Sequence, residues 1–188
     1  MNQPLVSIII NCFNGEKFLK EAIQSVIDQT YKNWELIFWD NQSTDNSAEI
    51  FKSYKDDRFK YFFASKHTLL YEARNYAVSQ SRGEFIAFLD VDDYWNHSKL
   101  EKQIPLFEDK KVGLVYGNFW QIKLINNKYK SRLPFPNYLP RGKITNDLLK
   151  EYVIGILTVV IRRKVIDNIK GPFNPRYHVI LLVWGDRL

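Results

Sequence analysis

The chain has 188 residues, of which 45% are hydrophobic and 26% charged, with 8 glycines and 7 prolines. These proportions predict one globular domain and exclude a collagen-like or disordered chain. The single cysteine, Cys12, excludes an intrachain disulfide and a cysteine-based zinc site, and it fits a reducing cytoplasm.

The formal charge of +6 fits an anionic substrate, an anionic membrane surface or no charged partner. The basic residues are spread along the chain, which disfavours a nucleic-acid partner and favours a solvated basic face. Their densest groups are Lys128, Lys130 and Arg132, then Arg141 and Lys143, then Arg162, Arg163 and Lys164.

Strand and helix signals alternate over the first 118 residues. Short apolar runs predict strands, and apolar residues at helical spacing predict helices between them. The predicted strands are 5–10, 34–39, 59–63, 84–89 and 112–116. The predicted helices are 18–27, 70–80 and 99–107, and the helix 70–80 is expected to end with Gly83. A further helix, expected between the second and third strands, carries Ile50, Phe51 and Tyr54 and can be capped by Ser43, Thr44 or Asp45. This order predicts an α/β fold with a largely parallel sheet covered on both faces.

The second half of the chain is less regular. It predicts a hairpin over 119–130 that turns at Asn126-Asn127, a proline-containing loop over 131–142, a helix over 145–153, a strand over 155–161 and a short helix over 163–169. We expect residues 1–188 to form a single domain, whose regular first half ends near residue 118.

No segment predicts a membrane-spanning helix. The longest apolar stretch, 153–161, is far shorter than the roughly 20 residues that a spanning helix needs. The N-terminus enters a strand-like run without a basic leader, so no signal peptide is expected. The predicted location is the cytoplasm, with peripheral contact at the inner face of the membrane left open.

Three polar clusters follow predicted strands: Asn11 to Asn14, Asp40 to Asn41, and Asp90 to Asp93. Ligands of open parallel α/β sheets collect at the carboxyl ends of the strands, where such loops converge. Asp90 and Asp92 are two residues apart, so in an extended segment both carboxylates point the same way. They predict a hard oxygen site for Mg²⁺ or Mn²⁺ that also takes substrate phosphates.

Two further residues are candidates from local context. Asp40 ends an apolar strand and can accept a hydrogen bond from the N–H of a uracil-like base; the alternative is that it only caps a turn. Arg74, on the predicted helix 70–80, can reach a phosphate; the alternative is a surface salt bridge. His67, His97 and His178 have no metal-ligand spacing and are assigned no role.

Four motifs, in order, resemble those of glycosyltransferase family 2. Val6 to Asn14 is similar to the family's first strand and nucleotide loop, and Trp39 to Asp45 to its Asp-Asp-Gly-Ser-Thr-Asp element, with Asp40 at the base-binding aspartate. Ala73-Arg74-Asn75 matches a common helix motif, and Gly83 to Asp93 matches the strand leading into Asp-x-Asp. The resemblance covers about residues 4–118. It implies that 1–118 is a nucleotide-sugar-binding half and 119–188 an acceptor-side half that is incomplete.

The resemblance implies a GT-A fold, a Rossmann-like three-layer α/β/α arrangement, and inverting transfer from a nucleoside-diphosphate sugar, often UDP-linked, to a glycan or lipid-linked acceptor. The implied nucleotide-sugar site comprises Asn11, Phe13, Asn14, Asp40, Arg74, Asp90, Val91 and Asp92, with Asp92 and Asp90 holding Mn²⁺ or Mg²⁺.

The implied catalytic base is missing from its usual place. In the family an acidic pair follows a Gly-x-Phe-Asn-like segment; here Gly171 to Asn174 supplies that segment, but Leu181 to Trp184 contains no acid and only Asp186 remains as a stand-in. We therefore expect a truncated or altered C-terminus. The open alternative is a binding module that holds nucleotide and metal without transferring a sugar. A nucleotidyltransferase is disfavoured because Asn11 to Lys17 is not a glycine-rich basic loop.

Overall fold

Seven consecutive residues of the first strand are all buried, as a central parallel strand requires. The computed structural model describes residues 3–136, 139–169 and 171–174. The strands are β1 (Val6–Cys12), β2 (Trp34–Asp40), β3 (Phe59–Phe63), β4 (Phe85–Phe88), β5 (Leu114–Val115) and β8 (Val160–Arg162), with β6 (Gln121–Ile125) and β7 (Lys128–Arg132) in a separate hairpin. The helices are α1 (Glu16–Ile27), α2 (Ser47–Ser53), α3 (Leu70–Ser79), α4 (Lys99–Gln103), α5 (Thr145–Lys150) and α6 (Arg163–Asp167), with the 3-10 turns η1 (Ile104–Glu108) and η2 (Ile156–Thr158).

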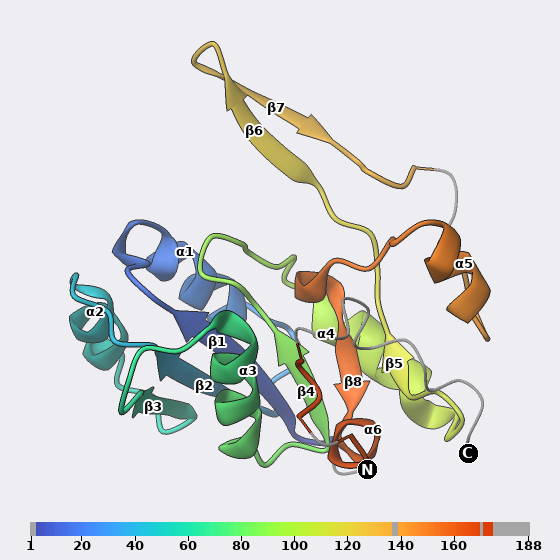
Figure 1. The fold of residues 1–188 in the computed structure, drawn as a ribbon, viewed down its shortest axis with the longest axis horizontal. Coiled ribbons are helices and arrows are strands. Elements are labelled where there is room, and N and C mark those ends of the chain that lie inside the picture. The colour runs from blue at the N-terminus through green and yellow to red at the C-terminus, as the bar shows by residue number, and fades with distance from the viewer. Residues whose placement is uncertain (1–2, 137–138, 170, 175–188) are drawn as a thin grey trace.

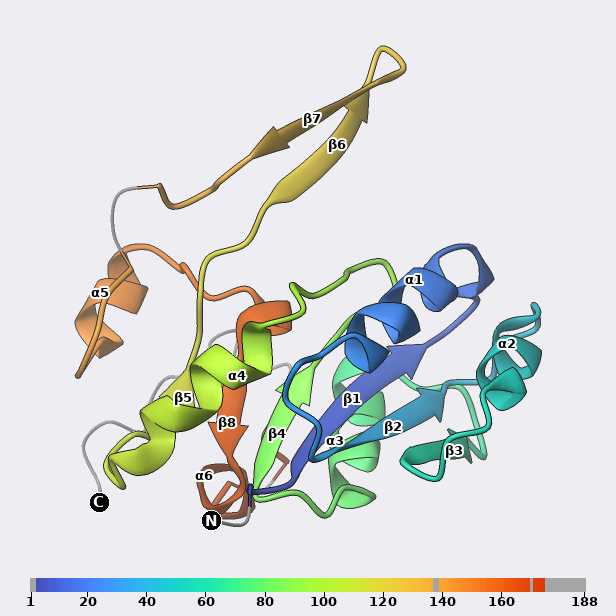
Figure 2. The same ribbon diagram turned by 180° about the vertical axis from the view of Figure 1, so that it is seen from behind.

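The central sheet has six strands in the order β3-β2-β1-β4-β8-β5. β1 pairs in parallel with β2 and β4, and β2 with β3, whereas β8 runs antiparallel to both β4 and β5. One hydrophobic cluster packs α1, α2 and α4 on one face, and a second packs α3 and α6 on the other. Figures 1 and 2 show these layers from opposite sides. The predicted three-layer α/β architecture is confirmed.

The second half follows the predicted order with shorter elements. The hairpin turns at Asn126 and Asn127, whose φ angles of 51° and 57° give the left-handed pair of a type I′ turn. The strand predicted over 155–161 is only partly correct, because η2 replaces its first part and β8 begins at Val160. The helix predicted over 145–153 ends at Lys150.

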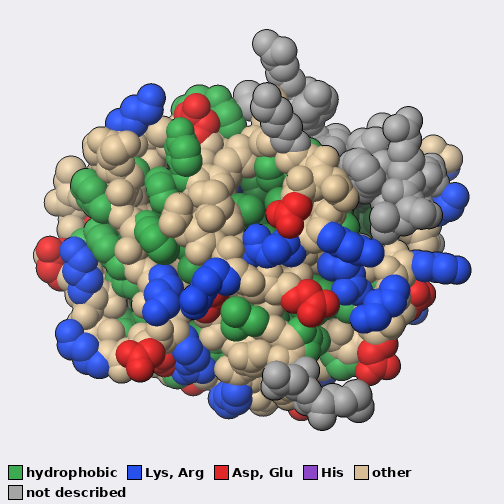
Figure 3. All heavy atoms as spheres, turned by 90° about the horizontal axis from the view of Figure 1, so that it is seen from below, with side chains coloured by type: hydrophobic (Ala, Val, Ile, Leu, Met, Phe, Trp, Pro, Cys, Tyr) green, Lys and Arg blue, Asp and Glu red, His purple; other side chains and the backbone are tan. Residues whose placement is uncertain are grey.

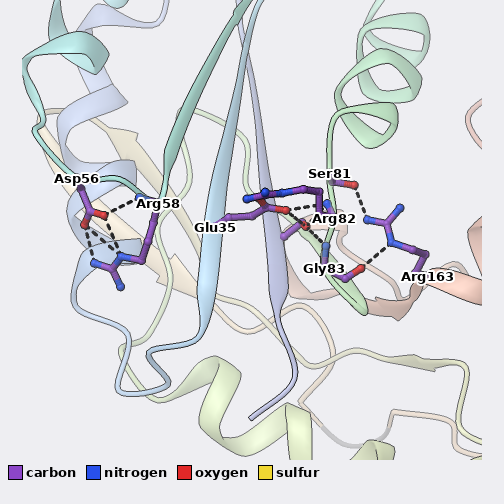
Figure 4. A network of polar contacts seen from close by, with 8 residues as sticks. Glu35, Asp56, Arg58, Ser81, Arg82, Gly83 and Arg163 are labelled. Atoms are coloured by element: carbon purple, nitrogen blue, oxygen red, sulfur yellow. Dashed lines mark hydrogen bonds and ion pairs between the residues drawn. The ribbon is translucent and has the colours of Figure 1, made fainter. Parts of the chain in front are cut away.

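A buried polar network joins β1, β2 and the segment before β4 at the N-terminal edge of the sheet (Figure 4). Glu35 is 3% exposed; its Oε1 accepts hydrogen bonds from Ser7 Oγ at 2.6 Å and Arg82 N at 2.7 Å. Burial alone would raise the pKa of Glu35, but the hydrogen bonds from Ser7 and Arg82 outweigh it and hold that pKa below its usual value. The backbone N–H of Gly83 donates to Ser7 Oγ at 2.7 Å, and a Cβ on Gly83 would lie 2.5 Å from Ser7 N. The N-terminal ends of the strands therefore have a structural role, and we expect the functional site at their carboxyl ends.

Among the described residues, no helix has the length and apolar character that crossing a membrane requires.

Candidate functional site

The loops after β1 and β2 are tied together at the carboxyl edge of the sheet. Asn14 has a φ of 54°, and its Oδ1 accepts from the backbone N–H of Thr44 at 2.7 Å. In return Ser43 Oγ accepts from Asn14 N at 3.1 Å. Asp45 Oδ1 accepts from the N–H of Ser47 at 3.0 Å. The N-cap position of α2 is Asn46, which makes no side-chain capping bond, so the prediction that Ser43, Thr44 or Asp45 caps this helix is wrong. The bonds between Asn14 and residues 43–44 join the loops after β1 and β2 into one continuous surface, which we call the wall.

An exposed aromatic ring stands on this wall. Phe13 is 52% exposed, and its ring centroid lies 4.4 Å from that of His67, with the planes tilted by 60°. His67 Nδ1 donates to the carbonyl oxygen of Asn41 at 2.9 Å. The Asn41 side chain in turn holds Thr68, donating to its carbonyl at 2.7 Å and accepting from its N–H at 3.1 Å. A third loop thereby joins this surface, with His67 in contact with both Phe13 and Asn41.

Two buried donors lie without partners on neighbouring strands at the same edge. Asn11 and Trp39 are register partners in β1 and β2. Asn11 Nδ2 and Trp39 Nε1 are shielded from solvent, and neither has a hydrogen-bond partner among the described residues. Trp39 stacks on Tyr76 of α3, with centroids 5.4 Å apart. Buried donors of this kind are uncommon in folded proteins and are met by a ligand or by ordered water.

Asp40 ends β2, as the sequence predicted. Its side chain is fully buried, with Oδ1 accepting from Ser43 N at 2.7 Å and Oδ2 from Tyr61 Oη at 2.8 Å. Both oxygens are therefore engaged within the protein. These bonds fit the turn-capping alternative, and contact of Asp40 with a base stays a prediction.

Arg74 lies beside Asp90 rather than free in the cleft. Its Nη2 donates to both carboxylate oxygens of Asp90, at 2.9 and 3.1 Å. The next residue on α3, Asn75, exchanges two hydrogen bonds with the backbone of Phe173, at 2.7 and 3.0 Å. The helix is thus fixed from both sides, and Arg74 sets the orientation of Asp90.

The Asp-Val-Asp segment forms a turn, so the prediction that it is extended is wrong. The N–H of Asp93 bonds to the carbonyl of Asp90 at 3.1 Å and closes this turn. Val91 is directed inward, 3.1 Å from where a Cβ on Gly15 would lie, and it packs against the core. The turn therefore anchors Val91 against the β1 loop and leaves Asp92 exposed.

The carboxylates of this turn crowd one another. Burial, and then the charges of Asp90 and Asp92, raise the pKa of Asp93 to about 6. Among the described residues, no three His, Cys, Asp or Glu side chains form a group able to hold a metal ion. An exposed carboxylate beside a second one still fits Mg²⁺ or Mn²⁺, since such ions bind through one or two carboxylates plus substrate phosphates. Asp92, with Asp90, would hold the ion.

A pocket of about 620 Å³ opens beside the turn. It is lined by Asp92, Asp93, Tyr94, Trp95, Asn96, Ser98, Lys99, Lys102, Gln103, Leu106, Val115, Tyr116, Gly117, Asn118, Phe119, Trp120, Ile122, Leu157 and Thr158. Tyr94 and Trp120 are 51% and 64% exposed, so both present aromatic surface to solvent.

The polar groups of this pocket include two without partners. Lys99 Nζ and Gln103 Oε1 are shielded from solvent, and neither has a hydrogen-bond partner among the described residues. They are four residues apart on α4 and so share one face of the helix. Lys99 Nζ lies 4.1 Å from the ring centroid of Trp95, and burial lowers the pKa of Lys99 to about 7. Neither residue belongs to a recognisable sequence spacing, so sequence patterns alone do not single them out.

The expected catalytic base cannot be placed, because Asp186 and the segment Leu181 to Trp184 lie outside the described residues. Of the other predicted residues, Asn11, Phe13 and Asn14 lie with the Asp90–Asp92 turn at the carboxyl ends of the strands. Asp40 lies buried at the end of β2 and holds the loop that follows it.

Comparisons with solved structures support the fold. The chain superposes on TarS 1-349 of S. aureus in complex with UDP-GlcNAc with a TM-score of 0.67 at 20% identity, covering 87% of this chain and 46% of that one. It superposes on the mannosyltransferase PcManGT from Pyrobaculum calidifontis in complex with GDP-Man and Mn2+ with a TM-score of 0.66 at 16% identity, covering 88% and 46%. At these identities the likeness concerns the fold, which is the GT-A arrangement expected from the sequence.

Relatives matched by sequence have a higher identity to this chain than these solved structures have. The chain is 38% identical over 174 residues to the UDP-Glc:alpha-D-GlcNAc-diphosphoundecaprenol beta-1,3-glucosyltransferase WfgD of Escherichia coli, covering 92% of this chain and 66% of that protein. It is 30% identical over 186 residues to the putative teichuronic acid biosynthesis glycosyltransferase TuaG of Bacillus subtilis, covering 97% and 71%. The chain thus spans about two thirds of these relatives. The family model described as glycosyl transferase family 2 matches residues 7–169, so the chain belongs to glycosyl transferase family 2.

Proposed function

We propose that this chain binds a nucleoside-diphosphate sugar, most simply a UDP-sugar, with Mn²⁺ or Mg²⁺, and transfers the sugar with inversion to a glycan or lipid-linked acceptor. The observation that carries the proposal is the meeting, at one sheet edge, of an exposed aromatic wall, a turn with three aspartates and an aromatic-lined pocket. Transfer needs these three parts side by side: a surface that binds the nucleotide, groups that stabilise charge on the departing diphosphate, and a pocket that binds the acceptor.

In this proposal the nucleotide lies against the wall formed by the β1 and β2 loops. Phe13, backed by His67, offers a ring face for the base. The unpartnered donors Asn11 Nδ2 and Trp39 Nε1 would meet acceptor atoms of the ligand. Asp40 and Asn14 act by holding the loops in place, since their polar atoms are engaged within the protein.

The diphosphate would lie over the Asp90–Asp92 turn. Asp92 is the exposed ligand for the metal ion, and Arg74 orients Asp90 beside it. A bound divalent ion supplies Lewis-acid stabilisation of the leaving diphosphate. The acceptor hydroxyl would then approach from the adjacent pocket.

The pocket fits an acceptor that combines a sugar with an anionic group. Tyr94 and Trp120 present aromatic surface on which a sugar ring can pack, and Gln103 Oε1 would accept from a hydroxyl. Lys99 Nζ would meet a phosphate oxygen. WfgD, by its name, acts on a diphosphoundecaprenol-linked sugar, which has this chemistry.

Thermal melting tests the donor site. We expect one of UDP, GDP, dTDP and CDP to raise the melting temperature in the presence of manganese, because ligands that bind the native state stabilise it. The increase should vanish in Asp92→Asn and persist in Asp57→Asn, which neutralises an exposed aspartate in another loop. The absence of any shift in the folded wild type would contradict the proposal.

The second candidate function is a nucleotide-sugar-binding module without transfer. It is favoured by the absence of an acidic residue from Leu181 to Trp184, where the family's base is expected. Nucleotide binding without sugar transfer to lipid-diphosphate-linked GlcNAc, in the full-length natural protein, would select this candidate.

A further inference from the structure

The hairpin β6–β7 extends away from the sheet, on the side of the molecule to which β4 points (Figures 1 and 2). All of its residues from Ile122 to Arg132 are exposed. A two-stranded ribbon has little stability of its own, and exposed apolar side chains on it indicate a surface that is covered in the working protein.

The pairing register separates the ribbon into two faces. Leu124 lies opposite Tyr129, and Ile122 opposite Ser131; Trp120, just before β6, continues the same alternation. The apolar side chains Trp120, Ile122, Leu124 and Tyr129 are 64%, 48%, 60% and 79% exposed. We call this set the apolar ribbon face.

The other face is basic. Lys123 lies opposite Lys130, Gln121 opposite Arg132, and Ile125 opposite Lys128. Like charges directly opposite each other on a ribbon are destabilising unless an anion lies nearby. The placement of Lys123 and Lys130 therefore indicates an anionic partner.

The net positive charge of the chain is concentrated in the sequence segment that contains this hairpin. Residues 110–146 contain eight of the 27 basic residues and none of the 21 acidic ones, so this segment carries +8 and the remainder of the chain −2. The basic residues are still spread along the chain, and the excess charge of this segment arises because it lacks acidic residues. The side of the molecule opposite the hairpin shows basic and acidic side chains interspersed (Figure 3).

We infer that the β6–β7 hairpin docks on an anionic membrane surface. The apolar ribbon face enters the boundary between headgroups and acyl chains, and the lysines reach lipid phosphates, as in interfacial amphipathic helices. A bilayer is the partner that offers both an apolar layer and a dense layer of anions, which matches the two faces of this ribbon.

The position of the pocket agrees with this orientation. Trp120 and Ile122 belong to the apolar ribbon face and also line the pocket that holds Lys99. Docking by this face would bring the mouth of the pocket to the bilayer, where a lipid-linked acceptor resides. The inference itself stands on the hairpin alone, so it does not depend on the proposed reaction.

Vesicle sedimentation of the full chain tests the inference. We expect binding to vesicles containing phosphatidylglycerol, much weaker binding to pure phosphatidylcholine, and a decrease as salt rises. Lys123→Gln with Lys130→Gln should weaken binding by roughly 30-fold, because each basic residue near an anionic surface contributes a factor of about five. Leu124→Thr with Tyr129→Thr, which keeps strand-forming residues, should weaken it by about tenfold or more.

The matched control is Lys20→Gln with Lys32→Gln, which removes the same charge from exposed positions outside the hairpin. It should bind vesicles like the wild type, and all three variants should melt like the wild type. Equal effects of the control and hairpin lysine pairs, or no binding to anionic vesicles, would overturn the inference. So would a dimer, seen by light scattering, that the Leu124/Tyr129 variant dissociates while vesicle binding is unchanged.

Discussion

The guanidinium of Arg74 spans both oxygens of Asp90, 2.9 and 3.1 Å away, and so ties α3 to the turn that follows β4. Arg74 is 16% and Asp90 33% exposed at the side chain, so this pair lies at the rim of the cleft rather than in the core. Its loss should change the stability by about 0–1 kcal/mol, as for other partly exposed pairs.

We predict that Arg74→Gln weakens the manganese-dependent melting shift with nucleotide, because Asp90 loses the group that orients it. The matched control is Arg58→Gln, which breaks the Asp56–Arg58 pair, joined at 2.6 Å, at another edge of the sheet. The control should leave nucleotide binding unchanged. If the Arg74 variant binds manganese and nucleotide like the wild type, Arg74 has no positioning role.

Phe13→Ala should reduce nucleotide affinity without unfolding the protein. The ring is 52% exposed, so its removal should change the stability by only about 0.5 kcal/mol. Loss of aromatic stacking on a base costs about 1–3 kcal/mol, which is roughly a 5- to 150-fold change in the dissociation constant. Calorimetric titration should show recovery in Phe13→Tyr and no effect in Phe18→Ala, which truncates an exposed ring on α1.

Lys99→Met should remove a pH-dependent component of stability. Burial lowers the pKa of Lys99 to about 7 in the folded protein, against about 10.4 in an unfolded chain. Between these values the unfolded chain binds more protons, so this lysine makes the wild type more stable as the pH rises from 7 to 10. Urea unfolding across this range should show a smaller increase in the Met variant.

The same substitution also tests the proposed acceptor site. Lys99→Met should raise the KM for a phosphate-containing acceptor and leave nucleotide binding intact. Lys102→Met, an exposed lysine one turn along the same pocket, is the control for the stability change. A wild-type pH profile that matches that of Lys99→Met would contradict the burial of the ammonium group.

Glu35→Gln should lower the free energy of unfolding by about 1–3 kcal/mol, because the Ser7 and Arg82 donors lose a buried carboxylate. The folded-state pKa of Glu35 is depressed, so its stabilisation is present above the unfolded value of about 4.3 and is lost as the pH falls through the folded value. The difference between wild type and variant should be constant from pH 7 to 5 and shrink below about pH 4. Glu21→Gln, on an exposed face of α1, should show no such difference.

The sequence by itself determined the order of elements and the edge at which the site forms. Apolar runs and helical periodicity predict β1 to β4 and α1 to α3 because burial on a sheet or a helix face repeats at short, regular intervals. The Asn126-Asn127 turn follows from local backbone preference. In the same way, Phe13, Asn14 and Asp90 to Asp92 follow strands whose direction the α/β order fixes, so their convergence could be predicted.

The tertiary structure decided which of these side chains face the cleft. Asp40 is buried by Tyr61 from β3, His67 reaches Phe13 from another loop, and Arg74 meets Asp90 across 16 positions of sequence. Lys99 and Gln103 gain importance only because the pocket leaves their polar atoms without partners. Each of these facts depends on how segments distant in the chain pack together, and short-range sequence patterns carry no information about that packing.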